Sequence, residues 1–280
     1  MNETQIYKQL HIKDTKELES ILANNNALAQ LKFQVEYQYF NLFSNSNLNN
    51  IDTLLNQTKN AGGLKSIKLG SNKVIGWYAI LNKNNPFTIN NLIYKVHTQP
   101  TLINTSIYYK MKERKLHLLS TYHLDRGHLL AKRFIDEKLI SINAIGKNEN
   151  HTLLNNRTKF SELGNLDNIF LQFKQANEND VNLHGQAYFE QLISTKFANC
   201  KLLNQIFYKV QAIFKDLNDS IPIGNELQAI IVNQTHLKPL FHVFIPNCDN
   251  NIDIINNNFF KAKNLHYLTY LNIKNNTLNS

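Results

Sequence analysis

Apolar residues alternate with other residues in the second half of the chain, with the period of two that is typical of β-strands burying one face. This period covers residues 208–214, returns at 227–231 and is found again at 241–245. Asn218-Asp219-Ser220 forms a turn sequence between the first two runs. Strands joined by short turns pair with their neighbours, so this half of the chain predicts an antiparallel meander.

Further elements follow from shorter patterns. Strands are predicted at Leu64–Leu69, Val74–Leu81, Leu92–Val96, Ile107–Lys112, Leu116–Leu124 and Ile169–Phe173. An amphipathic helix is predicted at Gln186–Asn199, and residues 141–161 read as polar and irregular. Runs of strands with helices set apart from them favour an α+β fold, an antiparallel sheet flanked by helices, over a doubly wound sheet.

Residues 1–60 read as a helical N-terminal extension. Asp14 and Glu17 have the spacing of a capping box at the start of one helix, and a second helix is expected at Ala27–Phe43, followed by a polar loop at 45–50. A helical hairpin packed on the main domain is the simplest interpretation, with a partner-binding or targeting role as the alternative. We therefore expect an extension (1–60), a main domain (61–270) and a C-terminal tail (271–280).

The predicted strand Leu116–Leu124 is followed by Asp125-Arg126-Gly127-His128, which places three chemically active side chains around one flexible residue. Arginine presents a planar, permanently charged group that suits phosphate oxygens. Histidine is the side chain best suited to accept a proton near neutral pH. These are the groups that phosphodiester hydrolysis requires, although so short a motif is also found in proteins without that activity.

Two later motifs make the pattern more specific. Asn168 is followed nine positions later by Asn177, and Gly-Gln-Ala-Tyr-Phe-Glu follows at 185–190. With Asp-Arg-Gly-His, these motifs resemble the DNA/RNA non-specific endonucleases of the ββα-metal, or His-Me finger, class, and most closely the bacterial DNA-entry and secreted nucleases. Weaker similarity extends to about residue 260.

The resemblance implies a ββα-metal nuclease fold and a role for each matched residue. It makes His128 the general base that deprotonates the attacking water, and Asn177 the protein ligand of a divalent ion, magnesium or alternatively manganese. Asn168 and Glu190 match positions that help to hold the water shell of the metal or the base. One departure is visible, because Glu178 follows Asn177 where glutamine is common in the family; this carboxylate would either tighten the metal site or weaken phosphate binding.

Within the central motif, Arg126 is the best candidate for clamping the phosphate or shaping the site, and Asp125 for orienting nearby groups. The other three arginines of the chain are Arg114, Arg133 and Arg157, all near this motif. Lysine would serve a solvated surface equally well, so the clustering favours substrate-binding contacts with phosphate over chance. A formal net charge of +9 also favours a polyanionic partner.

These observations predict a metal-dependent endonuclease that hydrolyses DNA and RNA with little sequence preference. Two alternatives remain open. The first is a nucleic-acid-binding protein whose catalysis is impaired, and the second is a phosphodiesterase or pyrophosphatase on the same scaffold.

The N-terminal residues and the hydropathy of the chain bear on its cellular location. The first residues lack the basic start and apolar run of a signal peptide, and no segment is apolar and long enough to span a membrane. A nuclease of this family would attack the nucleic acid of its host, so we expect export by another route, an accompanying inhibitor or immunity protein, or a natural export segment that is absent from this chain. Cys200 and Cys248 are the only cysteines, and either a disulfide or two free thiols is compatible with the sequence.

Overall fold

The structure of the protein is a computed structural model. It describes residues 1–25, 30–43, 48–70, 73–95, 124–147, 153–158, 160–161, 165, 167–180, 183–200, 205–216, 222–233, 236–248 and 250.

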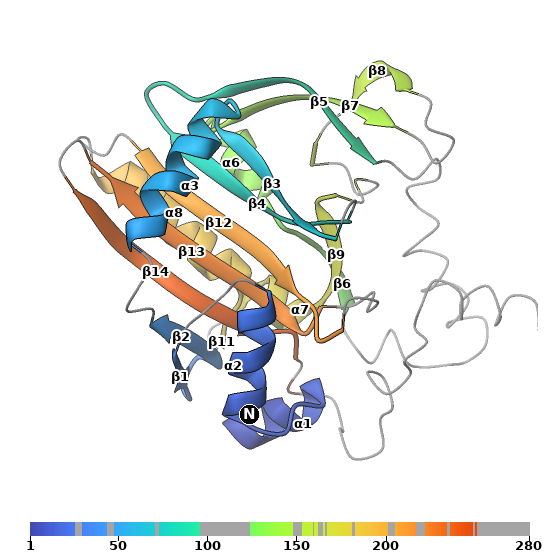
Figure 1. Ribbon diagram of the computed structural model, residues 1–280, viewed down its shortest axis with the longest axis vertical. Helices are drawn as coiled ribbons and strands as arrows, with labels where there is room; N and C mark the ends of the chain where they lie inside the picture. The colour runs from blue at the N-terminus through green and yellow to red at the C-terminus, as the bar shows by residue number, and fades with distance from the viewer. Residues whose placement is uncertain are drawn as a thin grey trace, which may run out of the picture.

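A seven-stranded sheet forms the centre of the molecule, and every neighbouring pair of its strands is antiparallel (Figure 1). The strand order is β1-β2-β14-β13-β12-β4-β3. The strands are β1 (Gln30–Gln34), β2 (Tyr39–Phe43), β3 (Leu64–Leu69), β4 (Lys73–Asn82), β12 (Gln205–Ile213), β13 (Gly224–Val232) and β14 (Leu237–Pro246). The predicted meander is confirmed as β12, β13 and β14.

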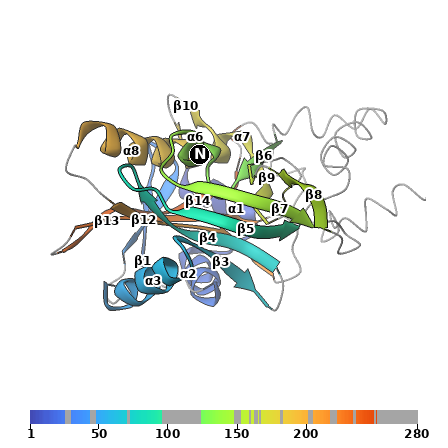
Figure 2. The ribbon, with the colours of Figure 1, turned by 90° about the horizontal axis from the view of Figure 1, so that it is seen from above.

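Helices cover both faces of this sheet (Figure 2). Alternate residues of β12 divide between the faces: Tyr208 joins the core under α8, whereas Phe207 packs with residues of α3 on the opposite face. The N-terminal helices also pack on that opposite face, against Ile213 and Phe244. The helices are α1 (Glu3–Leu10), α2 (Thr15–Asn24), α3 (Leu48–Asn60), α6 (Lys132–Asp136), α7 (Lys174–Asn177) and α8 (Gln186–Asn199).

Smaller sheets lie on the side of the central sheet that α8 covers. β6 and β9 form an antiparallel pair, β10 and β11 form another, and β5-β7-β8 form a three-stranded sheet in which β5 and β7 are parallel. Their bounds are β5 (Thr88–Lys95), β6 (Leu124–His128), β7 (Ser141–Lys147), β8 (Leu153–Thr158), β9 (Ile169–Phe173), β10 (Asn179–Asp180) and β11 (Leu183–His184). The α+β architecture predicted from the sequence is confirmed.

The N-terminal segment differs from the prediction. The second helix expected at Ala27–Phe43 is wrong, because β1 and β2 form a hairpin there, and β2 pairs with β14 of the central sheet. The apolar residues Phe40 and Leu42 are buried at alternate positions, which suits a strand, and Gln38 takes the left-handed φ of 59° that closes the turn. α3 occupies much of the expected polar loop. Residues 1–60 are thus helical only in part, and the domain boundaries stay predictions.

Two other expectations also change. Residues 141–161 are not irregular, because β7 and β8 lie within them and Ala144 of β7 is fully buried in the main core. The strand predicted to end before Asp125 instead contains the motif, since β6 runs from Leu124 to His128. Ile107–Lys112, 116–123, 218–220 and 271–280 fall outside the described residues. In the part of the chain that is described, no helix is long and apolar enough to cross a membrane.

Candidate active site

The Asp-Arg-Gly-His motif lies in β6, a strand whose only described partner is β9. The register pairs Leu124 with Phe173 and His128 with Ile169, so the motif ends where β9 begins. α7 follows β9 directly and packs against β6, and Figure 1 shows the three elements next to one another, to the right of the central strands. The two strands and the short helix therefore bring the histidine motif and the Asn168–Asn177 motif into one unit.

The imidazole of His128 is oriented by the main chain of another segment. Its Nε2 atom lies 3.1 Å from the carbonyl oxygen of Ser161. A carbonyl oxygen only accepts hydrogen bonds, so this contact requires the proton on Nε2. In the neutral ring, Nδ1 then carries the lone pair that can accept a proton.

Asn168 holds the chain immediately after His128. The side chain of Asn168 is fully buried; its Oδ1 accepts from the main-chain nitrogen of Leu130 at 2.8 Å, and its Nδ2 donates to the Leu130 carbonyl at 3.1 Å. The carbonyl of Asn168 also accepts from the nitrogen of Leu129, at 2.8 Å. Of the two roles that the resemblance implied, this geometry fits holding the base.

Gln186, the first residue of α8, holds the same segment from the other side. Its Nε2 atom lies 2.6 Å from the carbonyl oxygen of His128 and 3.0 Å from that of Leu129. Its Oε1 atom accepts hydrogen bonds from Asn225 at 2.7 Å and from Gln172 at 3.3 Å. The side chain is only 2% exposed, so these bonds form away from solvent, where an unpaired amide would be costly.

Gly127 is required by the close approach of Gln172. A Cβ atom at position 127 would lie 1.7 Å from Oε1 of Gln172, far inside van der Waals contact. The Gln172 side chain is buried and donates a hydrogen bond to Gln186, so it is not free to move aside. The glycine of the motif therefore makes room for the amide network that supports His128.

Glu190 lies one turn further along α8, where it is buried. Desolvation raises the pKa of this carboxyl to about 8, although the hydrogen bond from Gln186 and the charge of Arg133 act in the opposite direction. The group is therefore largely protonated at neutral pH. Its Oε1 atom accepts from Nε2 of Gln186 at 2.7 Å, which joins Glu190 to the network under His128.

Asn177 is the last residue of α7 and is half-buried. Glu178, the departure from the family pattern, is exposed, and its carboxylate lies 3.4 Å from Nζ of Lys174 in an ion pair along the chain. Among the residues that are described, no three histidine, cysteine or acidic side chains gather into a metal-binding cluster. A site built on an amide oxygen lies outside that pattern.

The arginines are placed unequally. Arg133 in α6 donates to Oε1 of Gln191 in α8, so it lies beside the helix that carries Gln186. Asp125 and Arg126 lie in β6 opposite Gln172 and Leu171, and Arg157 lies in β8 opposite Ile145. Nothing is described of these three side chains, and Arg114 lies outside the described residues.

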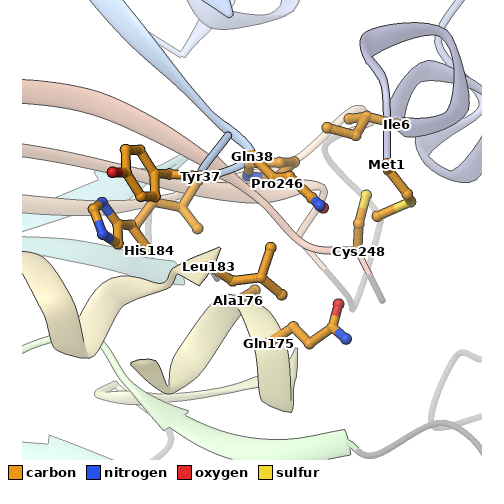
Figure 3. Close-up of a pocket in the computed structure, with 11 residues that line it drawn as sticks. Met1, Ile6, Tyr37, Gln38, Gln175, Ala176, Leu183, His184, Pro246 and Cys248 are labelled. Carbon is orange, nitrogen blue, oxygen red and sulfur yellow. The ribbon is translucent and has the colours of Figure 1, made fainter. Parts of the chain in front are cut away.

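A pocket lies on another side of α7, where the N-terminal helix meets the end of β14 (Figure 3). Gln175 and Ala176 of α7 line it, facing Met1 and Cys248. At one end of the pocket, the ring of His184 stacks on Tyr37 with 3.9 Å between ring centroids. None of the residues predicted for the site lines this pocket. Both cysteines are free thiols.

The sequence did not single out the amides beneath His128. Gln186 belongs to the matched Gly-Gln-Ala-Tyr-Phe-Glu segment, but no role was inferred for it. The available signal for a structural role of Gln186 was its position in the first turn of a predicted amphipathic helix, on the side expected to be buried. Gln172 and Asn225 carried no signal, because their meeting depends on how β9 and β13 lie in space.

Comparisons with known proteins give structural likeness only. No family model matches the chain, and no curated protein matches it. The chain is similar to NucA from Streptococcus agalactiae with magnesium bound, at 16% identity and a TM-score of 0.45, over 85% of this chain and 91% of that one. The metal-free structure of the same NucA matches at 18% identity and a TM-score of 0.42, over 81% of this chain and 89% of that chain.

The Sda1 nuclease with bound zinc matches at 14% identity and a TM-score of 0.34, over 67% of this chain and 74% of that chain. Because each TM-score is below 0.5, we base the functional assignment on the residues of this chain rather than on these matches.

Proposed function

We propose that the protein is a metal-dependent, sequence-non-specific endonuclease that hydrolyses phosphodiester bonds of DNA and RNA, with a ββα-metal site built from β6, β9 and α7. The observation that carries the proposal is the orientation of His128. Its Nε2–H donates to the carbonyl of Ser161, which leaves Nδ1 as the basic atom.

His128 then acts as the general base. Its Nδ1 takes a proton from the water that attacks phosphorus, and the contact with Ser161 keeps the ring in the tautomer that this step needs. The fixed main chain on either side of Leu129 holds the imidazole at a constant position relative to the phosphate.

Asn177 is the proposed ligand of a divalent ion, for which magnesium is the best fit. Magnesium retains several waters and needs few protein oxygens, so one half-buried amide at the end of a short helix is compatible with it. A bound ion would neutralise charge on the phosphate and supply a water that protonates the leaving oxygen. Glu190 supports the main chain under His128 through its hydrogen bond with Gln186.

The substrate side of the site is basic. The net charge of +9 favours capture of a polyanion, and Arg133 lies next to α8 with Arg126 in the strand of the base. Contacts with phosphate position a nucleic acid without reading its bases. We therefore propose cleavage of DNA and RNA with weak base preference.

A plasmid-nicking assay tests the proposal. Supercoiled DNA is incubated with the protein in magnesium, in excess EDTA, and in EDTA followed by added magnesium. We expect nicking and linearisation in magnesium, none in EDTA, and recovery on adding the ion back. The His128→Ala variant in the same assay excludes a contaminating nuclease.

The two alternatives give different outcomes in this assay. DNA binding in a gel-shift experiment without any nicking would favour a nucleic-acid-binding protein with impaired catalysis. Release of phosphate or mononucleotides from small diester substrates, with the plasmid left intact, would favour a phosphodiesterase or pyrophosphatase. Either result would refute the endonuclease.

A further inference from the structure

The amide network under His128 has a chemical consequence that goes beyond the roles the resemblance assigns. Where the β6–β9 ladder ends, the main chain of residues 128–130 has two carbonyl oxygens, those of His128 and Leu129, that face Gln186. The side chain of Asn168 forms hydrogen bonds with the main-chain nitrogen and carbonyl of Leu130. The main-chain carbonyl of Asn168 accepts a hydrogen bond from the nitrogen of Leu129. Two side chains and the main-chain carbonyl of Asn168 thus take the place of the partner strand.

From this geometry we propose that Gln186 is a positioning residue for the general base: its amide fixes the main-chain turn at His128–Leu129 and thereby the place of the imidazole. The proposal rests on the proposed function, because it assigns Gln186 an effect on the reaction through His128. Gln186 does not touch substrate in this role.

The support of Gln186 comes from deep inside the molecule. Asn225 in β13, a central strand of the large sheet, is 1% exposed and donates to Oε1 of Gln186 at 2.7 Å. Gln172 in β9 donates to the same atom at 3.3 Å. The amide of Gln186 is therefore oriented with its nitrogen toward His128, because its oxygen is held by two donors. The side chains of Asn225 and Gln186 thus connect the central sheet with the main chain at the base.

Such a connection should act on the rate of the chemical step more than on substrate binding. A displacement of about 1 Å at a reacting group can cost about 10²-fold in rate. Two of the proposed phosphate-binding arginines lie outside the strand of the base, Arg133 on α6 and Arg157 on β8. Loss of Gln186 should therefore lower kcat and leave KM close to that of the wild type.

The test is Gln186→Met, which keeps the side-chain length and removes every hydrogen bond. We expect kcat for DNA cleavage to fall about 10²-fold with little change in KM. The matched control is Gln211→Met, because Gln211 is also 2% exposed and donates one hydrogen bond, to the carbonyl of Asn25, on the opposite face of the sheet. The control should lose some stability, less than Gln186→Met because fewer hydrogen bonds are removed, and keep its kcat. Equal losses of kcat in the two variants would overturn the proposal.

A double-mutant cycle separates positioning from a general loss of structure. In the His128→Ala background there is no base left to position, so Gln186→Met should cause no further loss of the residual activity. Independent, multiplicative losses would overturn the positioning role.

If Gln186→Met does not fold, Asn225→Ala serves instead, because it removes one support of Gln186 and leaves the bond to His128 in place. It should lower kcat in the same way, by a smaller factor, and a kcat equal to that of the wild type would contradict the proposal. Failure of the proposed function gives a different result, in which His128→Ala itself retains full activity or the wild type cleaves nothing.

Discussion

Asn168 and Leu130 exchange two hydrogen bonds, so that one buried amide satisfies both the nitrogen and the carbonyl of a residue two positions after His128. This pairing resembles the exchange between two strands, but a side chain takes the place of the partner backbone. It fixes where the chain goes after the proposed base.

From that pairing we expect Asn168→Ala and Asn177→Ala to fail in different ways. Asn168→Ala leaves two buried main-chain groups unpaired, at about 1–3 kcal/mol for each, and should lower the melting temperature clearly. Asn177→Ala, at a half-buried position, should change stability less and instead require much more magnesium for activity. Thermal unfolding and magnesium titration of both variants check this. If Asn168→Ala alone shows the raised magnesium requirement, the two roles are exchanged.

His128→Ala should lower the rate of DNA cleavage by about 10²–10⁴-fold, the usual effect of removing a general base. Because the ring is only partly buried, folding and DNA affinity should be largely retained. Cleavage rates, circular dichroism and gel shifts measure the three quantities. His236→Ala is the control, since His236 is exposed next to β14 and should tolerate the change. Turnover close to that of the wild type would remove His128 from the mechanism.

Glu226 should make stability depend on pH on the acidic side. Burial alone would raise the pKa of this carboxyl, but Lys209, 2.6 Å away, and the hydrogen bond with His242 together bring it below the ordinary value of 4.5. The unfolded chain then binds the proton more readily than the folded protein. The stabilisation is therefore complete above about pH 4.5 and is lost as the pH falls through the lower, folded-state pKa.

Glu226→Gln tests this dependence. The variant should be less stable than the wild type at pH 7, by about 3–5 kcal/mol, because it leaves the buried ammonium of Lys209 without its counter-charge. Its stability should also fall less steeply below pH 4.5. Denaturant unfolding at several pH values measures both effects, with Glu178→Gln as a control in an exposed ion pair. Identical pH dependence in Glu226→Gln and the wild type would refute the assignment.

Cleavage should show weak base preference and strong salt dependence. Neutralised phosphates release counterions, so the logarithm of the binding constant should fall by about 0.9 per contacted phosphate for each unit of log salt on duplex DNA. Binding measured between low and moderate salt, and mapping of cut ends on mixed-sequence DNA and RNA, provide the test. A single dominant recognition sequence, or binding indifferent to salt, would contradict this prediction.

The sequence by itself determined those parts of the protein in which local pattern and burial agree. The alternation at residues 208–214 predicted β12 because one side of that strand packs under α8. The amphipathic run at Gln186–Asn199 predicted α8 with its bounds, since one face of the helix is buried against the sheet. The Asp-Arg-Gly-His motif and the Asn168–Asn177 pair could likewise be recognised from residue type and spacing alone, without knowledge of any contact between them.

Only the tertiary structure decided how those residues are supported. The hairpin of β1 and β2 was mistaken for a helix because its strands are short and gain their burial from β14 and the N-terminal helices, which are distant in sequence. The bonds of Gln186 to His128 and of Asn225 to Gln186 join residues 58 and 39 positions apart. Hydrogen bonds of that kind leave no period in the sequence, because they depend on how separately formed strands and helices pack together.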